Sequence, residues 1–261
     1  MNSTIILRNI PKKAIKLDQV VYPNIEGGFR GFFHVPPGLH YISVLSSLSH
    51  IGFWCFSKPN DAVVKVFNSD ENCFEDDDSK SEKKFKHLAL SGAMESTLKT
   101  YSLQYFPEWQ AMTCYIKEEF FPPTIYELEP PSSSRFESSF KGTHGGNIDS
   151  FLQEFQFSFL KWYCSTLTEV QEISSFERWT HLLQSVYNAG ERNISESPRL
   201  FIDLTDSMIA QFSCLNEDYF GNGSPVIENI KYLIEDMQDS GNSEANEKAL
   251  ALEDYLENKY E

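Results

Sequence analysis

The chain of 261 residues has 41% hydrophobic and 14% aromatic residues, which is enough to fill a core and excludes a globally disordered protein. Its formal net charge of −16 is uneven, since residues 1–131 hold 13 Lys and Arg against 16 Asp and Glu while the remainder holds 9 against 22. An acidic second half repels phosphate, which argues against duplex nucleic acid and favours a basic protein partner. Solubility alone would also account for the excess of acidic residues.

Other bulk features exclude further classes of protein. The longest apolar stretches, such as Ile51–Phe56, are far shorter than the roughly 20 residues that a membrane span needs. The first residues lack the basic and apolar pattern of a signal peptide. Five scattered cysteines, an odd number without close pairs, argue against a disulfide framework and indicate a reducing compartment. We therefore expect a cytoplasmic and nuclear protein that does not bind membranes.

The first half predicts short strands. Runs of β-branched and aromatic residues, of which Ile51–Phe56 and Ala62–Phe67 are the clearest, alternate with tight turns such as Val35-Pro-Pro-Gly38. Consecutive strands with no helix between them indicate an antiparallel β-sandwich or barrel. Two short helices are expected over residues 94–117, where Pro107 would break the first from the second. This β-rich domain is placed at residues 1–121.

Residues 122–147 predict a linker between two domains. The segment contains four prolines, the serine run Ser132–Ser134 and the glycine-rich sequence Lys141–Asn147, with no hydrophobic period. Such a density of Pro, Ser and Gly without periodicity is typical of a domain boundary.

The remaining residues, 148–261, predict an all-α, VHS-like bundle. Aromatic and aliphatic residues recur there at helical spacing, and short connections between helices favour a compact packing. A serine followed three residues later by glutamate suggests a capping box, and prolines at two positions suit a first helical turn. The five expected helices are 148–163, one capped by Ser174, one from Pro198, one from Pro225 and one over 243–257. The whole chain is thus expected to be an α+β protein of two domains.

The sequence contains no motif that indicates catalysis. It has no Gly-x-x-x-x-Gly-Lys phosphate loop, no Gly-x-Ser-x-Gly turn and no His-Glu-x-x-His zinc helix. His34 and His40 flank the Pro-Pro-Gly turn and could place two metal ligands near one another, but no cysteine or third histidine stands close. Hydrogen bonding is the simpler interpretation of both residues. We expect no enzyme activity, no cofactor and no metal.

Two segments carry a family resemblance. The first reads Phe29-Arg-Gly-Phe-Phe-His-Val-Pro-Pro-Gly-Leu-His40, and the second combines Phe155-Gln-Phe-Ser-Phe159 with the downstream Trp179. In this order and spacing they resemble the Aar-two family, also called the a-one-cistron splicing factors. The signature residues, whose role is structural or in partner contact, are Phe29, Arg30, Gly31, Pro36, Pro37, Gly38, His40, Phe155, Gln156, Phe157, Phe159 and Trp179.

The resemblance implies a function in splicing. It implies an assembly chaperone of the U-five small nuclear ribonucleoprotein that binds the large scaffold protein of that particle, through its RNase-H-like and Jab/MPN-like domains. Such a chaperone would hold the scaffold immature and delay the joining of the spliceosomal helicase. We expect no direct contact with nucleic acid and a monomer when the protein is free.

The signature residues can also act inside the fold. Gly31 and Gly38 permit turns or a close approach of backbone, because glycine lacks a side chain. Pro36-Pro37 makes a rigid turn, and His40 could form a hydrogen bond with the backbone across it. The three phenylalanines of the second segment cannot share one side of a helix, so at least one would pack on the neighbouring domain or on a partner.

Two other classes of function stay open at this point. A generic adaptor with a peptide-gripping helical domain would need the same features, and a hydrolase could have a site without a known motif. Regulation by phosphorylation is a further hypothesis, because a phosphate beside an acidic region would repel an acidic surface of a partner. The candidate phosphorylation sites are Ser133, Ser138, Ser240 and Ser243.

Overall fold

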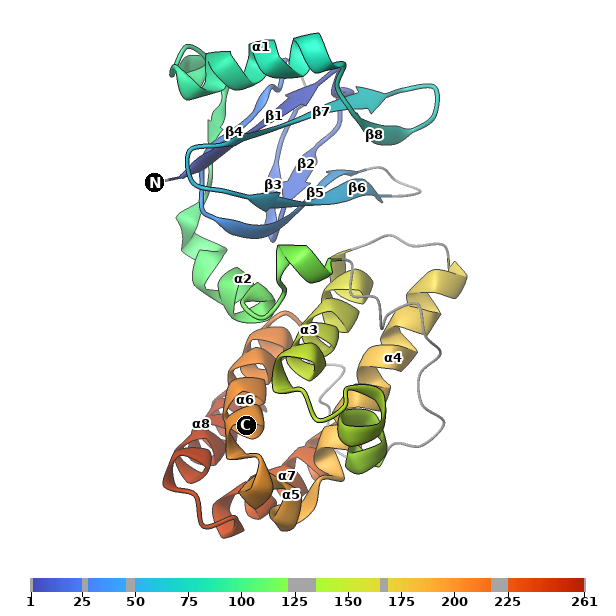
Figure 1. Cartoon of the computed structure of the whole chain (residues 1–261), viewed down its shortest axis with the longest axis vertical. Coiled ribbons are helices and arrows are strands. Elements are labelled where there is room, and N and C mark those ends of the chain that lie inside the picture. The colour runs from blue at the N-terminus through green and yellow to red at the C-terminus, as the bar shows by residue number, and fades with distance from the viewer. Residues whose placement is uncertain are drawn as a thin grey trace. The chain divides into compact units, whose positions relative to one another are not determined.

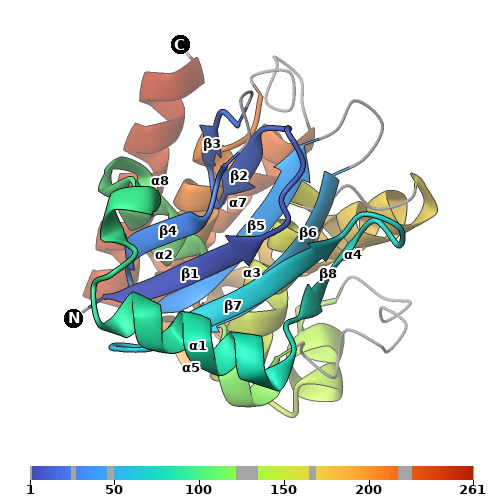
Figure 2. The ribbon, with the colours of Figure 1, turned by 90° about the horizontal axis from the view of Figure 1, so that it is seen from above.

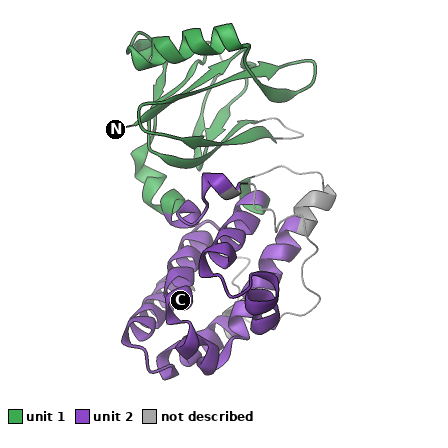
Figure 3. Cartoon of the chain, viewed as in Figure 1, with its two compact units in different colours: residues 1–110, 162–172 green, residues 111–161, 173–261 purple. Residues whose placement is uncertain are grey.

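The computed structural model describes residues 2–24, 28–45, 50–121, 135–164, 169–216 and 225–260. The chain divides into two compact units, shown in two colours in Figure 3. Unit 1 comprises residues 1–110 and 162–172, and unit 2 comprises residues 111–161 and 173–261. Unit 1 is rich in strands and unit 2 is helical, which confirms the predicted α+β chain of two domains.

Unit 1 contains two β-sheets. The five-stranded sheet has the order β8 (Cys73–Asp76), β7 (Ala62–Asn68), β1 (Ser3–Arg8), β4 (Gly31–Val35) and β9 (Lys99–Thr100). The four-stranded sheet has the order β3 (Val20–Tyr22), β2 (Ile15–Leu17), β5 (Gly38–Leu45) and β6 (His50–Ser57). Strands β4 and β5, joined by the Pro36-Pro37 turn, belong to different sheets.

The two sheets lie as stacked layers, as Figure 1 shows, and enclose the core of unit 1. Ile5 and Leu7 of β1 share this core with Ile15 of β2 and Ile42 and Val44 of β5. Burying the apolar faces of two sheets against each other is the driving force of such a sandwich.

The five-stranded sheet is mixed, although the turns of the sequence predicted antiparallel strands only. β1 pairs with β4 in the antiparallel sense but with β7 in the parallel sense, with Thr4 opposite Ala62. β4 and β9 are also parallel. The reason is topological: the chain between β1 and β7 passes through the other sheet, so no tight turn sets the direction of this pair.

Helix α1 (Ser79–Leu90) lies across β1 and β7 on the outer face of the five-stranded sheet (Figure 2). The Asp78 side chain accepts hydrogen bonds from the amides of Lys80 and Ser81 and so caps the helix. Beyond α1, the first of the two predicted helices is replaced by two short 3₁₀ turns, Glu95–Thr97 and Leu103–Tyr105, with β9 between them, while the second is present as α2 (Phe106–Thr113).

The prediction that Pro107 breaks a helix is wrong. Pro107 is the second residue of α2 (Phe106–Thr113), a position where the amide of a helix has no intrahelical partner in any case. The proline therefore begins this helix rather than ending one.

Six α-helices of the described residues form unit 2. They are α3 (Ile148–Cys164), α4 (Glu169–Tyr187), α5 (Gly190–Glu196), α6 (Pro198–Ser213), α7 (Pro225–Asp239) and α8 (Ser243–Tyr260). Residues 162–164 and 169–172, at the ends of two of these helices, belong to unit 1. The helix starts predicted at Pro198 and Pro225 are confirmed, and α5 is a short helix that the sequence did not indicate. In the described part of the chain, no helix is both long and apolar enough to cross a membrane.

Ser174 does not cap a helix, because it lies inside α4. The expected linker also differs from the structure. Residues 138–143 form a turn of π-helix, and Phe136 and Phe140, which flank its start, stack at 5.2 Å between ring centroids and are buried. Aromatic packing thus makes residues 135–147 part of unit 2, while residues 122–134 lie outside the described residues.

Candidate functional site

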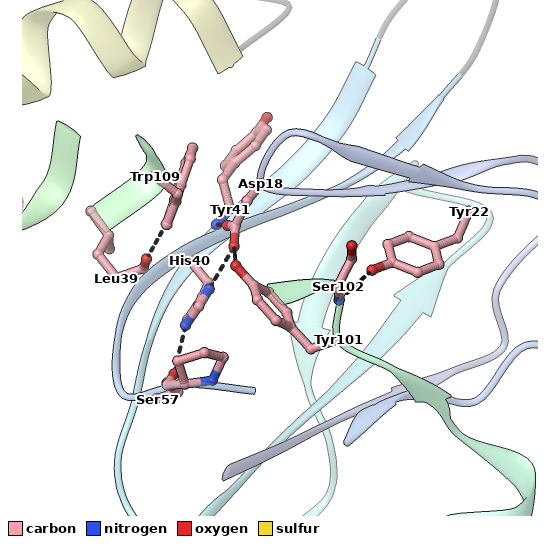
Figure 4. Close-up of polar contacts among 10 residues, drawn as sticks. Asp18, Tyr22, Leu39, His40, Tyr41, Ser57, Tyr101, Ser102 and Trp109 are labelled. Carbon is pink, nitrogen blue, oxygen red and sulfur yellow. Dashed lines mark hydrogen bonds and ion pairs between the residues drawn. The ribbon is translucent and has the colours of Figure 1, made fainter. Parts of the chain in front are cut away.

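A buried polar network in unit 1 centres on Asp18, between β2 and β3. Asp18 has a φ of +53° and is buried. Its Oδ1 accepts a hydrogen bond from the amide of Tyr41 at 2.9 Å, and its Oδ2 accepts one from the Tyr101 hydroxyl at 2.8 Å. Nδ1 of His40 lies 2.7 Å from the same Oδ2. Figure 4 shows His40 and Tyr101 converging on this carboxylate.

His40 connects this network to the Pro-Pro-Gly turn. Its Nε2 lies 2.8 Å from the carbonyl oxygen of Pro36, which also accepts a hydrogen bond from the Ser57 hydroxyl. Both ring nitrogens therefore face acceptors, and only the doubly protonated imidazolium donates to both. Burial opposes the charge, but the Asp18 carboxylate and the Pro36 carbonyl outweigh it and raise the pKa of His40.

The contact with Pro36 is the hydrogen bond across the turn that the sequence predicted for His40. His34, in contrast, is the extra residue of a β-bulge, since Ser3 pairs with Val35 and Thr4 with Phe33. It has a φ of +59° and an exposed side chain. The two histidines thus play separate parts, and the described residues contain no group of three or more His, Cys, Asp or Glu that could hold a metal.

The glycines of the first signature segment allow unusual backbone. Gly31 has a φ of +123°, and a Cβ at this position would lie 1.9 Å from the carbonyl oxygen of Ile5. Gly38 has a φ of +133° but open space around it. Close approach of strands β1 and β4 explains the first glycine, and the turn conformation explains the second.

The other members of the first segment divide by exposure. Phe29 and Pro36 are buried, and the Phe29 ring packs edge-on against Phe32 at 5.1 Å. Arg30 and Pro37 are exposed. Only these two of the signature residues present their side chains to solvent, so partner contact by the first segment would involve them.

The second signature segment lies in α3, which is buried on all sides between residues 151 and 160. Phe155 and Phe159 are fully buried, and Phe157 packs on Phe121 at 5.1 Å between ring centroids. The sequence suggested that at least one of the three rings would need the other domain or a partner to cover it. In the structure all three rings are buried, so none of them is exposed for a partner.

Gln156 joins α3 to the segment that follows Gln110. Its Nε2 donates to the carbonyl of Ala111 at 2.8 Å and to the Ser207 hydroxyl at 3.0 Å, while its Oε1 accepts from the amide of Tyr115 at 3.0 Å. A side chain of another helix thus provides hydrogen-bond partners for backbone groups at the end of α2. The signature glutamine thus has a structural role inside unit 2, because it links α3 to the end of α2 and to α6.

Trp179 has a similar internal role. Its ring is buried, stacks at a tilt on Phe159 with 5.2 Å between centroids, and donates from Nε1 to Oε1 of Gln211 at 2.9 Å. Helices α3, α4 and α6 therefore meet at this tryptophan.

Sequence reasoning missed a buried charge cluster in unit 2. Oε1 of Glu154 accepts a hydrogen bond from Arg178 at 2.5 Å, and Oε2 lies 2.7 Å from Nε2 of His144. Nδ1 of His144 lies 2.9 Å from the Ser150 hydroxyl. The one available signal was Glu154 itself, the single charged residue of α3 between Asp149 and Lys161. Its partners are 24 and 10 residues away and follow no local pattern.

The candidate phosphorylation sites have different environments. Ser243 is exposed at the start of α8, whereas Ser138 and Ser240 are half-buried. The Ser240 hydroxyl donates to the carbonyl of Met237 at 2.7 Å. Ser133 lies outside the described residues. Phosphorylation at these four positions stays a prediction.

Comparison with known proteins gives the family. A model described as the AAR2 N-terminal domain matches residues 1–130, and one described as the AAR2 C-terminal repeat region matches residues 115–261. The chain is 27% identical over 103 residues to the Protein AAR2 homolog of Caenorhabditis elegans. That alignment covers 39% of this chain and 28% of the relative. The two family models together span both units, and the chain belongs to the AAR2 family, the Aar-two family that its motifs resemble.

Proposed function

We propose that this protein is an assembly chaperone of the U-five small nuclear ribonucleoprotein. In this role it binds the large scaffold protein of the particle, through the scaffold's RNase-H-like and Jab/MPN-like domains, and delays the joining of the helicase. It acts in the cytoplasm and the nucleus. The observation that carries the proposal is the match of both AAR2 models in order along the chain. Membership of this family of non-catalytic splicing factors supports a role in splicing.

The architecture supports a binding function. Ten of the twelve signature residues hold turns and helices in place, and the glutamine, histidine and tryptophan among them form internal hydrogen bonds. The signature residues therefore stabilise the fold of this protein, and its outer surface is left for a partner. The acidic excess of residues 132–261 suits a basic partner surface and would speed association.

Binding of the purified chain to the purified scaffold protein tests the proposal. We expect the two to co-elute in size-exclusion chromatography, with binding that weakens as salt is raised, because charges steer the association. The helicase should bind the scaffold less well in the presence of the chain than in its absence. Absence of co-elution at low salt, or undiminished binding of helicase, would contradict the proposal. Binding of unrelated peptides by the chain, together with failure to bind the scaffold protein, would favour an adaptor.

A further inference from the structure

Arg30 is the exposed cation of the first signature segment, and its backbone is held firmly. Its carbonyl accepts a hydrogen bond from the amide of Leu7 at 2.9 Å, and the preceding Phe29 is buried in the core. The following Gly31 touches the backbone of Ile5. Packing on both sides therefore fixes the point from which the Arg30 side chain extends.

Arg30 borders a pocket on the outer face of the five-stranded sheet, beside α1. We call it the outer pocket; it has a volume of about 250 Å³ and is lined by Ile6, Arg8, Asn9, Ile10, Arg30, Phe85 and Met94. This volume is below the roughly 300–1,000 Å³ of sites for drug-sized ligands, and suits one or two amino-acid side chains.

The charges in the outer pocket leave Arg30 available. Arg8 pairs with Asp77, and its guanidinium lies 4.7 Å from the centre of the Phe85 ring. Among the residues that the structure describes, Arg30 forms no ion pair, and its Nη1 donates only to the adjacent Phe29 carbonyl at 3.3 Å. In a chain of net charge −16, Arg30 thus presents a guanidinium that no described residue neutralises, at the edge of a pocket lined by both polar and apolar side chains.

We propose that the outer pocket binds an acidic peptide segment of a partner protein, with a carboxylate on Arg30 and a neighbouring apolar side chain against Phe85 and Met94. The planar guanidinium matches a carboxylate with two parallel hydrogen bonds. The apolar side chains of the lining, Phe85 and Met94 among them, add contact area that a free anion or a nucleic-acid backbone would not use. The contact depends on the chemistry of the bound segment, whatever the identity of the partner.

Nuclear magnetic resonance on the full chain tests the proposal. The probe is the peptide acetyl-Gly-Glu-Phe-Gly-amide, and the signals are the Met94 methyl group and the Arg30 Nε–H group. We expect both signals to shift on titration. The peptide with Gln in place of Glu should bind at least fivefold more weakly, and so should the Glu peptide to an Arg30→Gln variant.

The matched control is Arg192→Gln, because the Arg192 side chain is 87% exposed on α5. It should bind the Glu peptide as the unaltered chain does, and an unchanged far-ultraviolet circular dichroism spectrum should show that Arg30→Gln is folded. Equal binding of the Glu and Gln peptides, or binding that Arg30→Gln leaves unchanged, would overturn the proposal. Binding of a phosphoserine peptide without binding of the Glu peptide would overturn the choice of a carboxylate.

Discussion

Oδ2 of Asp18 lies 2.7 Å from Nδ1 of His40, and both side chains are buried inside unit 1. The same carboxylate also accepts the Tyr101 hydroxyl, which burial and the Asp18 charge keep protonated by raising the pKa of Tyr101. One carboxylate therefore joins the turn after β2, strand β5 and the segment after β9. The negative charge of the Asp18 carboxylate is buried, so water does not screen its hydrogen bonds to these three stretches of chain.

The first prediction concerns the pH dependence of stability. The pKa of His40 is raised in the folded chain above its unfolded value of about 6.5, so the stability that it contributes is complete below about pH 6.5 and is lost as pH rises through the folded pKa. We expect the free energy of unfolding, measured in urea between about pH 6 and pH 8, to fall as pH rises. His40→Gln should flatten this slope. A slope that the variant leaves unchanged would assign the effect to other groups.

The second prediction separates backbone strain from steric contact at two glycines. Gly31 and Gly38 have similar φ angles, +123° and +133°, but only at Gly31 would an added methyl group collide with backbone, 1.9 Å from the Ile5 carbonyl oxygen. Gly38→Ala should therefore destabilise by about 1–3 kcal/mol through strain alone. Gly31→Ala should exceed this by at least about 2 kcal/mol, because β1 and β4 must move apart. Urea unfolding of both variants measures the difference, and equal losses would contradict the close contact.

The third prediction concerns the signature glutamine of α3. Gln156→Leu keeps the volume of the side chain but leaves the Tyr115 amide and the Ala111 carbonyl without this partner. A buried group left without a hydrogen bond costs about 1–3 kcal/mol, and these two groups are partly buried, so we expect a loss of about 1–3 kcal/mol in unfolding free energy. Asn246→Leu, at an exposed position of α8, is the control and should change little. A small effect of Gln156→Leu would show that water or a shift of α2 replaces the bonds.

The fourth prediction compares a buried and an exposed pair of Glu and Arg. Glu154→Gln removes a charge that faces Arg178 and His144, and breaking a buried pair in this way destabilises by about 3–5 kcal/mol. Glu196→Gln removes the partner of Arg192 on the surface of α5 and should leave the thermal midpoint close to that of the unaltered chain. Thermal unfolding followed by circular dichroism measures both midpoints. Similar midpoints for the two variants would mean that Glu154 is not the buried anchor that the distances indicate.

Local patterns predicted the parts of this protein that depend on local physics. Proline at a first helical turn predicted the starts of α6 and α7, and the Pro-Pro-Gly turn predicted the hydrogen bond of His40, because each depends on residues a few places apart. Pro107 shows the limit of such reasoning, since the same residue type can end a helix or begin one, and packing decides which.

The two-domain α+β organisation and, through the motifs, the family follow from the amino-acid sequence alone. The partners of Asp18, the parallel pairing of β1 with β7 and the ion pair of Glu154 with Arg178 depend on how the chain packs in three dimensions. Tyr101 lies 83 residues from Asp18, and nothing in the spacing of either residue points to the other. Such contacts form because folding buries whole faces of sheets and helices together, and each buried charge then needs whichever partner that packing brings within reach.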